Sequence, residues 1–120
     1  MMNLNYKKLK IWQRSVDFSC TVYQVSQKFP DSEKFGLTSQ IRRAAVSIPS
    51  NIAEGAGRKS EPDFLRFLRF AEGSANEVET QIYIAQKLGF LDADTSKNLC
   101  LEINEILKMV GGFSKKLDQN

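Results

Sequence analysis

Apolar residues recur at every third or fourth position along most of the chain. This spacing matches the 3.6-residue turn of an α-helix, and the alternating pattern of a strand is nearly absent. Pro30 and the glycines at 55, 57 and 89 interrupt the pattern where helices commonly end. The sequence therefore predicts four helices, at about residues 6–28, 37–56, 61–88 and 92–116.

The ends of the third expected helix have residues suited to capping. Ser60 is a favoured N-cap, Pro62 is tolerated in the first turn, and Asp63 can complete a capping box. Gly89 is placed to follow the last helical turn in the left-handed conformation that glycine adopts readily. At 1.5 Å per residue this helix would be about 42 Å long.

Three of the expected helices have an apolar stripe with alternating steps of three and four residues. Such stripes are typical of helices that pack at shallow angles, and short connections favour antiparallel neighbours. The predicted fold is all-α, with residues 1–120 forming a single antiparallel up-down four-helix bundle domain. The stripes are Leu9, Trp12, Val16, Cys20 and Tyr23 in the first helix, Phe64, Leu68, Ala71, Ala75, Val78, Ile82 and Ala85 in the third, and Leu99, Ile103, Ile106, Val110, Phe113 and Leu117 in the fourth.

Pro49 lies inside the second expected helix, in phase with isoleucines before and after it. A proline there removes the hydrogen bond to the Ala45 carbonyl and crowds that carbonyl, at a cost of about 3 kcal/mol. Because the periodicity continues in phase, we expect one proline-kinked helix rather than two separate helices. The hydroxyls of Ser47 and Ser50 are candidates to satisfy the freed backbone groups.

The first and third helices have more apolar surface than one bundle needs. A second stripe on the first helix lies about 180° from the Leu9 stripe, and Phe70 and Ile84 lie off the stripe of the third. Either the chain covers these residues itself, or a second subunit does; their extent favours a homo-oligomer. The residues predicted for the oligomer interface or a structural polar network are Ile11, Phe18, Val22, Val25, Glu54, Phe70, Gly73, Ser74 and Glu77.

The composition offers little for catalysis. Histidine is absent, so the commonest general base and metal ligand are missing. Cys20 and Cys100 are too few and too far apart for a metal site, and we expect no metal or cofactor. Ser47 or Ser50 with Glu54 could form a nucleophile and base on one helix face, but no histidine or lysine activates either serine. The sequence therefore predicts that the protein is not an enzyme.

The charge is unevenly distributed along the chain. Residues 1–70 contain 12 Lys or Arg against 6 Asp or Glu, whereas residues 71–120 contain 5 against 8. Arginines near a helix N-terminus suit phosphate binding, but an ordinary solvated surface stays an equal alternative. No motif for reading bases is present, so any contact would be electrostatic and salt-dependent. The candidate nucleic-acid-binding residues are Arg42, Arg43, Arg58, Lys59, Arg66 and Arg69.

Neither a bilayer-spanning apolar run nor the apolar core of a signal peptide is found, so a cytoplasmic location is expected.

The segments "YKKLKIWQRSVDF", "EKFGLTSQIRRAAVSIPSNIAEGAGR" and "FLRFLRFAEGSANEVETQIYIAQKLGFL" closely resemble the four-helix-bundle family of 23S rRNA intervening-sequence proteins. The resemblance covers about residues 6–117. It implies a small bundle that assembles into a ring-shaped homopentamer, without established enzymatic activity, metal or cofactor. Some members are encoded inside intervening sequences of bacterial ribosomal RNA genes. A related branch, the accessory protein of diversity-generating retroelements, engages a reverse transcriptase and nucleic acid through a basic surface.

The resemblance also implies which positions determine fold and assembly, namely Arg42, Arg43, Ser47, Pro49, Asn51, Glu54, Gly55, Arg58, Gly73, Ser74 and Glu77. We therefore expect a non-enzymatic homo-oligomeric bundle that serves as an interaction module for RNA, an RNA-processing protein or an RNA–protein assembly. No small-molecule substrate or membrane partner is indicated. The alternative is a protein-binding scaffold that does not bind nucleic acid.

Overall fold

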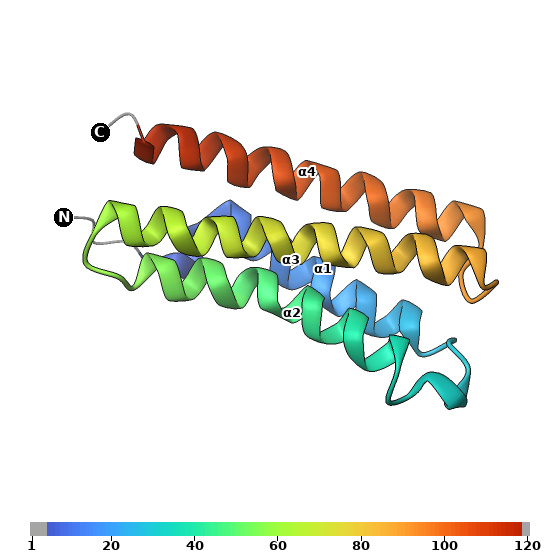
Figure 1. Ribbon diagram of the computed structural model, residues 1–120. Coiled ribbons are helices and arrows are strands. Elements are labelled where there is room, and N and C mark those ends of the chain that lie inside the picture. The colour runs from blue at the N-terminus through green and yellow to red at the C-terminus, as the bar shows by residue number, and fades with distance from the viewer. Residues whose placement is uncertain (1–4, 119–120) are drawn as a thin grey trace.

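Four α-helices make up most of the chain, as the apolar periodicity predicts. The computed structural model describes residues 5–118, and all structural statements concern these residues. The elements are η1 (Tyr6–Lys8), α1 (Lys10–Ser26), η2 (Asp31–Glu33), α2 (Leu37–Ala56), α3 (Glu61–Lys87) and α4 (Ala93–Asp118). The helices lie side by side in a bundle of 47 × 23 × 20 Å, and successive helices are joined at alternate ends (Figure 1). The all-α bundle prediction is confirmed.

The first helix is shorter than predicted because its start is a separate 3-10 turn. The side chain of Asn5 caps that turn by accepting a hydrogen bond from the backbone N–H of Lys7. Leu9 then adopts an extended conformation, with ψ of 126°, so the α-helix begins only at Lys10. The turn and helix together lie within the predicted range.

The second helix is continuous from Leu37 to Ala56 with Pro49 inside it. This excludes the alternative of two separate helices, while a kink at Pro49 stays a prediction. The carbonyl of Ala45 loses its usual donor because Pro49 has no N–H. The hydroxyl of Ser19 on α1 lies 2.9 Å from that carbonyl oxygen and can donate to it. The expectation that Ser47 or Ser50 would supply this donor was wrong, since the donor comes from the neighbouring helix.

The second apolar stripe of the first helix, which was predicted for an interface, lies inside the chain's own core. The side chains of Ile11, Phe18 and Val22 are at most 4% exposed and belong to the chain's own core. Their assignment to a subunit interface is therefore wrong, and Val25 is also partly buried against that core. In the opposite stripe, Leu9 and Trp12 are partly buried against the core, whereas Cys20 and Tyr23 are exposed. Two apolar stripes on opposite sides of one helix contain no information about which one its partners cover.

The third and fourth helices bury the stripes that the sequence indicates. All seven residues of the α3 stripe are at most 1% exposed, and the α4 stripe is buried except for the partly buried Phe113. Gly55 allows α2 and α3 to approach closely, because a Cβ there would lie 2.8 Å from Phe64 Cδ1 and Phe67 Cβ. Gly55 is thus an interior packing position rather than the helix terminator that its residue type suggested.

Capping fixes the connections on either side of α3. The Ser60 hydroxyl accepts a hydrogen bond from the Asp63 backbone N–H, as predicted for an N-cap. Gly89 adopts φ of +81°, and the next residue, Phe90, donates its N–H to the Ala85 carbonyl. This is the left-handed helix end that the glycine predicts. None of the helices in residues 5–118 combines the length and apolar character needed to cross a membrane.

Candidate nucleic-acid interface

Three segments that are distant in the sequence meet at one end of the bundle and make it basic. Residues 5–10, 54–66 and 108–118 lie at the end where α1 begins, α2 passes into α3 and α4 finishes (Figure 1). Together they contain nine Lys or Arg and four Asp or Glu. We call these three segments the basic end. The fold therefore concentrates at one place a positive charge that the sequence distributes over three.

Arginines and phenylalanines alternate along one side of the basic end. The guanidinium carbon of Arg58 lies 4.7 Å from the ring centroid of Phe67, and that of Arg66 lies 5.1 Å from the same centroid. Arg66 is also 5.7 Å from the ring centroid of Phe70, whose side chain is 47% exposed. The two rings meet edge to face at 5.5 Å. We call Arg58, Arg66, Phe67 and Phe70 the arginine–aromatic cluster.

Acidic neighbours partly neutralise this cluster. Arg58 forms an ion pair of 3.0 Å with Glu54, and Arg66 lies 3.5 Å from Asp63. All four side chains are well exposed, so each pair contributes at most about 1 kcal/mol and can be exchanged for another anion. Glu54, in the last turn of α2, thus pairs with Arg58 just beyond the end of that helix.

Lys59 and Arg69 complete the basic surface near the cluster. Both are exposed, and within residues 5–118 neither has a carboxylate within ion-pair distance. Their charges are therefore available to an incoming anion. The sequence analysis identified the cations of this surface but not the aromatic side chains, Phe67 and Phe70, that lie among them. The signal was the run "RFLRF" at residues 66–70, in which Phe70 was assigned to an interface and Phe67 was given no role.

The N-terminus of α3 does not add an anion site here. Ser60 already accepts from one of its backbone N–H groups, and Glu61 and Asp63 occupy the first turn. Negative side chains at this position balance the helix dipole and repel a phosphate. The positive charge of this surface therefore comes from the arginine and lysine side chains.

Arg42 and Arg43, predicted with the same group, lie elsewhere. Arg42 donates to the Ser26 hydroxyl at 2.8 Å and to the Tyr23 carbonyl at 3.2 Å, and it covers the Tyr23 ring at 4.6 Å. It ties the end of α1 to α2 and is not available for phosphate. Arg43 lies fifteen residues before Arg58, which is about 22 Å along a helix. The structure thus divides the predicted set, leaving Arg58, Lys59, Arg66 and Arg69 together.

Arg43 instead lines an open polar cleft between α2 and α3. The cleft has a volume of about 390 Å³, and Gln40, Ser47 and Glu77 also line it. The hydroxyls of Ser47 and Ser74 lie 2.8 Å apart across the two helices, and Asn51 donates to Ser47 at 2.9 Å. Ser47 is therefore engaged by a second serine and an amide rather than by a base, which leaves it without activation as a nucleophile.

Three other residues predicted for the interface, Gly73, Ser74 and Glu77, belong to the α3 side of this region, which we call the α2–α3 face. A Cβ on Gly73 would meet nothing within 4 Å, so the surface is open beside Ser74. Glu77 is exposed, and Gln81 donates to it at 3.4 Å. Glu54 and Phe70, in contrast, take part in contacts of the arginine–aromatic cluster.

A second exposed surface lies between α1 and α2. Val16, Cys20 and Tyr23 from α1 and Val46 and Pro49 from α2 line a largely apolar groove of about 470 Å³. The sequence analysis recognised Val16, Cys20 and Tyr23 as one apolar stripe but did not identify Val46 beside it. In this groove the exposed Cys20 and Tyr23 stay uncovered by the chain.

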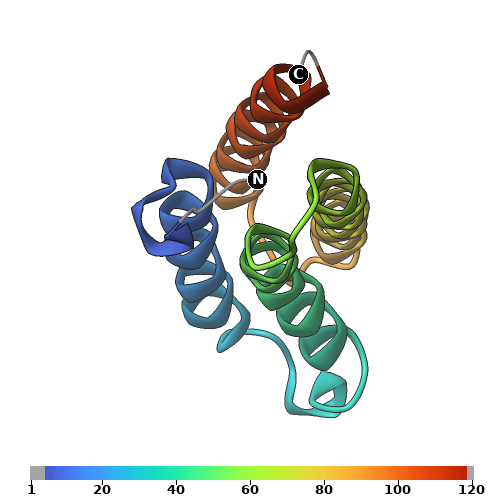
Figure 2. The ribbon, with the colours of Figure 1, turned by 90° about the vertical axis from the view of Figure 1, so that its left-hand side faces the viewer.

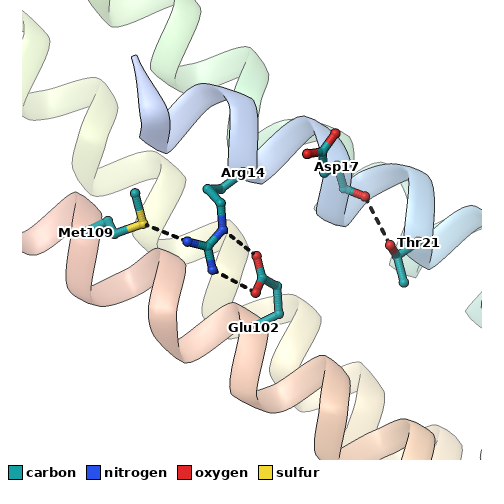
Figure 3. A network of polar contacts seen from close by, with 5 residues as sticks. All are labelled: Arg14, Asp17, Thr21, Glu102 and Met109. Carbon is teal, nitrogen blue, oxygen red and sulfur yellow. Dashed lines mark hydrogen bonds and ion pairs between the residues drawn. The ribbon is translucent and has the colours of Figure 1, made fainter. Parts of the chain in front are cut away.

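The ionic contacts elsewhere join the helices to one another. Arg14 on α1 forms two hydrogen bonds of 2.9 Å to the carboxylate of Glu102 on α4, and it lies 3.8 Å from the sulfur of Met109 (Figure 3). The hydrogen bond and the charge of Glu102 raise the pKa of Arg14. Burial raises the pKa of the Cys100 thiol, and the nearby Glu79 adds to this effect. Residues 5–118 contain no group of His, Cys, Asp and Glu that could hold a metal ion.

The fold places the chain among the small four-helix bundles. A sequence model of the 23S rRNA-intervening sequence proteins matches residues 7–112. The chain therefore belongs to this family, and the resemblance inferred from its motifs is confirmed.

A solved structure gives an independent comparison of the fold. The crystal structure of a protein of unknown function from the S23 ribosomal protein family of Bacteroides thetaiotaomicron superposes with a TM-score of 0.79 at 23% sequence identity. The match covers 88% of this chain and 98% of that one. At this identity the likeness concerns the fold alone. A search of curated proteins gave no significant match.

Proposed function

We propose that the protein is a non-enzymatic, homo-oligomeric module that binds RNA through its basic end in the cytoplasm. The observation that carries this proposal is the arginine–aromatic cluster, with Lys59 and Arg69 beside it. Lysine and arginine attract phosphates, while exposed aromatic rings and guanidinium planes stack on unpaired bases. A surface that combines both suits RNA better than it suits an acidic protein, which would not use the rings in this way.

Charge sets the expected strength of the interaction. The basic end has nine cations but four carboxylates, and two of its arginines already have acidic partners. Binding should therefore be moderate, and it should weaken with salt because each phosphate contact releases counterions. The ring of Phe70 would contribute a part of the affinity that salt does not screen.

The test is direct binding of a labelled structured RNA at two salt concentrations, measured by fluorescence anisotropy. The variant with Arg58→Ala, Lys59→Ala and Arg66→Ala should bind more weakly, and its salt dependence should be shallower by roughly two to three units on a log–log plot. The matched control replaces Lys34, Lys87 and Lys97, at the opposite end, by Ala and should bind normally. Absence of binding by the unaltered protein at low salt would refute the proposal.

Assembly is the second part of the proposal. The α1–α2 groove and the α2–α3 face flank the same helix, and both present surface that a neighbouring subunit could cover. A chain that uses two different faces forms a ring when the rotation closes, and the family resemblance implies five subunits. Gly73→Leu should reduce the mass in sedimentation if its face is an interface. An unaltered protein that sediments as a monomer at micromolar concentration would refute this part.

The alternative is a protein-binding scaffold whose cations only keep it soluble. Its supporting observation is that Glu54 and Asp63 already pair with the arginines of the cluster. A folded, oligomeric protein without measurable RNA affinity at low salt would favour it.

A further inference from the structure

A cleft opens at the basic end, on the side opposite the α2–α3 face. It lies between the start of the chain's first helix and the last turns of α4 and has a volume of about 470 Å³. Figure 2 shows α1 and α4 together on one side of the bundle, with α2 and α3 on the other. Neither surface proposed for assembly includes this cleft, so a ring built through α2 leaves it open.

The lining of the cleft separates into an apolar floor and a basic rim. The floor consists of Leu9, Ile11, Met109 and Phe113, and the rim of Lys8, Lys10 and Lys116. No carboxylate is found among the described residues that line it. A cavity of this size is within the usual range of about 300–1,000 Å³ for small-molecule sites. The matching occupant is therefore an apolar body joined to an anionic group.

The position of each floor residue is fixed by the fold. Phe113 packs against the buried Phe64 at a centroid distance of 5.4 Å. The sulfur of Met109 contacts the guanidinium of Arg14, whose charge is already matched by Glu102 (Figure 3). The positive charge that faces the cleft therefore comes from the lysines, while the ring and the thioether form a prearranged apolar surface.

Gly112 is the position on α4 at which the absence of a side chain leaves room in the cleft. A Cβ at this position would meet nothing within 4 Å, so the space beside the helix is empty. Glycine in a helix interior costs about 0.5–1 kcal/mol relative to alanine. Gly111 has the same open surroundings but does not line the cleft. This neighbouring pair offers a matched comparison.

We propose that the cleft holds one unpaired nucleotide of a single-stranded RNA. The base lies against Phe113 and Met109, and Lys8 and Lys10 contact the flanking phosphates. This inference rests on the proposed RNA binding and specifies its substrate, because a duplex keeps its bases stacked and cannot insert one. A free fatty acid would satisfy the floor, but its single carboxylate could pair with only one of Lys8 and Lys10, whereas the phosphates on either side of a nucleotide can pair with both.

The test compares a 12-nucleotide single strand with a duplex of the same length. Gly112→Leu fills the cleft without changing charge, and it should lower the affinity for the single strand by about 5- to 150-fold, the loss of one stacked base. Gly111→Leu should bind as the unaltered protein does, and duplex binding should change in neither variant. Equal single-strand affinity in both glycine variants would overturn the assignment of the cleft.

A second measurement places the base directly and does not depend on any substitution. A strand that contains 4-thiouridine, irradiated in complex with the unaltered protein, should cross-link to peptides that include residues 109–113. Cross-links confined to residues 58–70 would leave RNA binding at the basic end intact and refute the cleft. A protein that binds neither strand nor duplex at low salt would instead refute the proposed function itself. Binding of a long-chain fatty acid in the cleft by a protein that has no RNA affinity would also overturn the inference.

Discussion

The hydroxyl of Ser19 on α1 supplies a hydrogen bond to the carbonyl of Ala45, which Pro49 leaves without its helical donor. Ser19 Oγ is also 2.9 Å from the Ser15 carbonyl, but that carbonyl has its own helical donor. The single hydroxyl proton therefore stabilises the fold more when it is donated to the Ala45 carbonyl than when it is donated to the Ser15 carbonyl. A proline that would weaken an isolated helix is in this way accommodated by its neighbour.

Ser19→Ala should lower the free energy of unfolding by about 1–3 kcal/mol, because the buried Ala45 carbonyl loses its donor. In a Pro49→Ala background the main-chain N–H returns, and the same substitution should cost less. Urea denaturation of the four proteins gives the coupling energy. Ser15→Ala, one turn earlier and also buried, is the control and should cost the same in both backgrounds. Additive effects of Ser19→Ala and Pro49→Ala would contradict this explanation.

Gly55→Ala should destabilise the bundle by about 1–3 kcal/mol, because the new methyl group would overlap Phe64 and Phe67. Gly57→Ala, two residues later, meets only ordinary contacts at 3.6 Å and beyond and should be neutral or slightly stabilising. Thermal unfolding followed by circular dichroism compares them. Similar melting temperatures for the two variants would show that α2 and α3 are not in close contact at Gly55.

The start of α4 should confer a pH dependence on stability. Asp92 accepts a hydrogen bond of 2.6 Å from the Thr95 backbone N–H, and this bond lowers the pKa of Asp92 below its ordinary 3.8. Because the folded pKa is the lower one, the stabilisation is complete above the ordinary value and is lost as the pH falls through the folded pKa.

Asp92→Asn keeps a capping oxygen without a titrating charge, so it isolates this effect. Unfolding of the two proteins should differ most above pH 4, and the difference should shrink as the pH falls below that value. A difference that stays constant from pH 7 to pH 2.5 would show that the charge of Asp92 does not contribute.

Gly112→Ala should raise the free energy of unfolding by about 0.5–1 kcal/mol, since alanine favours the helix and the added methyl group meets nothing. Chemical denaturation measures the change. A destabilised Gly112→Ala protein would mean that the space beside α4 is filled. The cleft would then not extend to Gly112.

The sequence predicted the elements well because the determinants were local. The bounds of α2 and the buried stripes of α3 and α4 follow from apolar spacing, and the ends of α3 follow from Ser60 and Gly89. The wrong assignment of Phe18 and its stripe to a subunit interface has a different cause. Its two stripes are equally apolar, and only contacts with residues of other helices decide that Phe18 points inward.

The candidate site was predicted only in part, for a related reason. Arg58 and Arg66 could be grouped because one short turn joins their helices. Arg42 could not be excluded, because its partners Ser26 and Tyr23 lie on α1. The cleft was not foreseen, since its walls come from opposite ends of the chain and meet only in the folded bundle.

The most direct test of the central claim, that the basic end binds RNA, is the dependence of RNA affinity on salt for the unaltered protein and for the triple variant of Arg58, Lys59 and Arg66. Our account predicts that the affinity of the unaltered protein falls as salt rises. It also predicts that the variant binds more weakly with a shallower slope, while the Lys34, Lys87 and Lys97 control behaves as the unaltered protein. Identical slopes and affinities for all three proteins would contradict it.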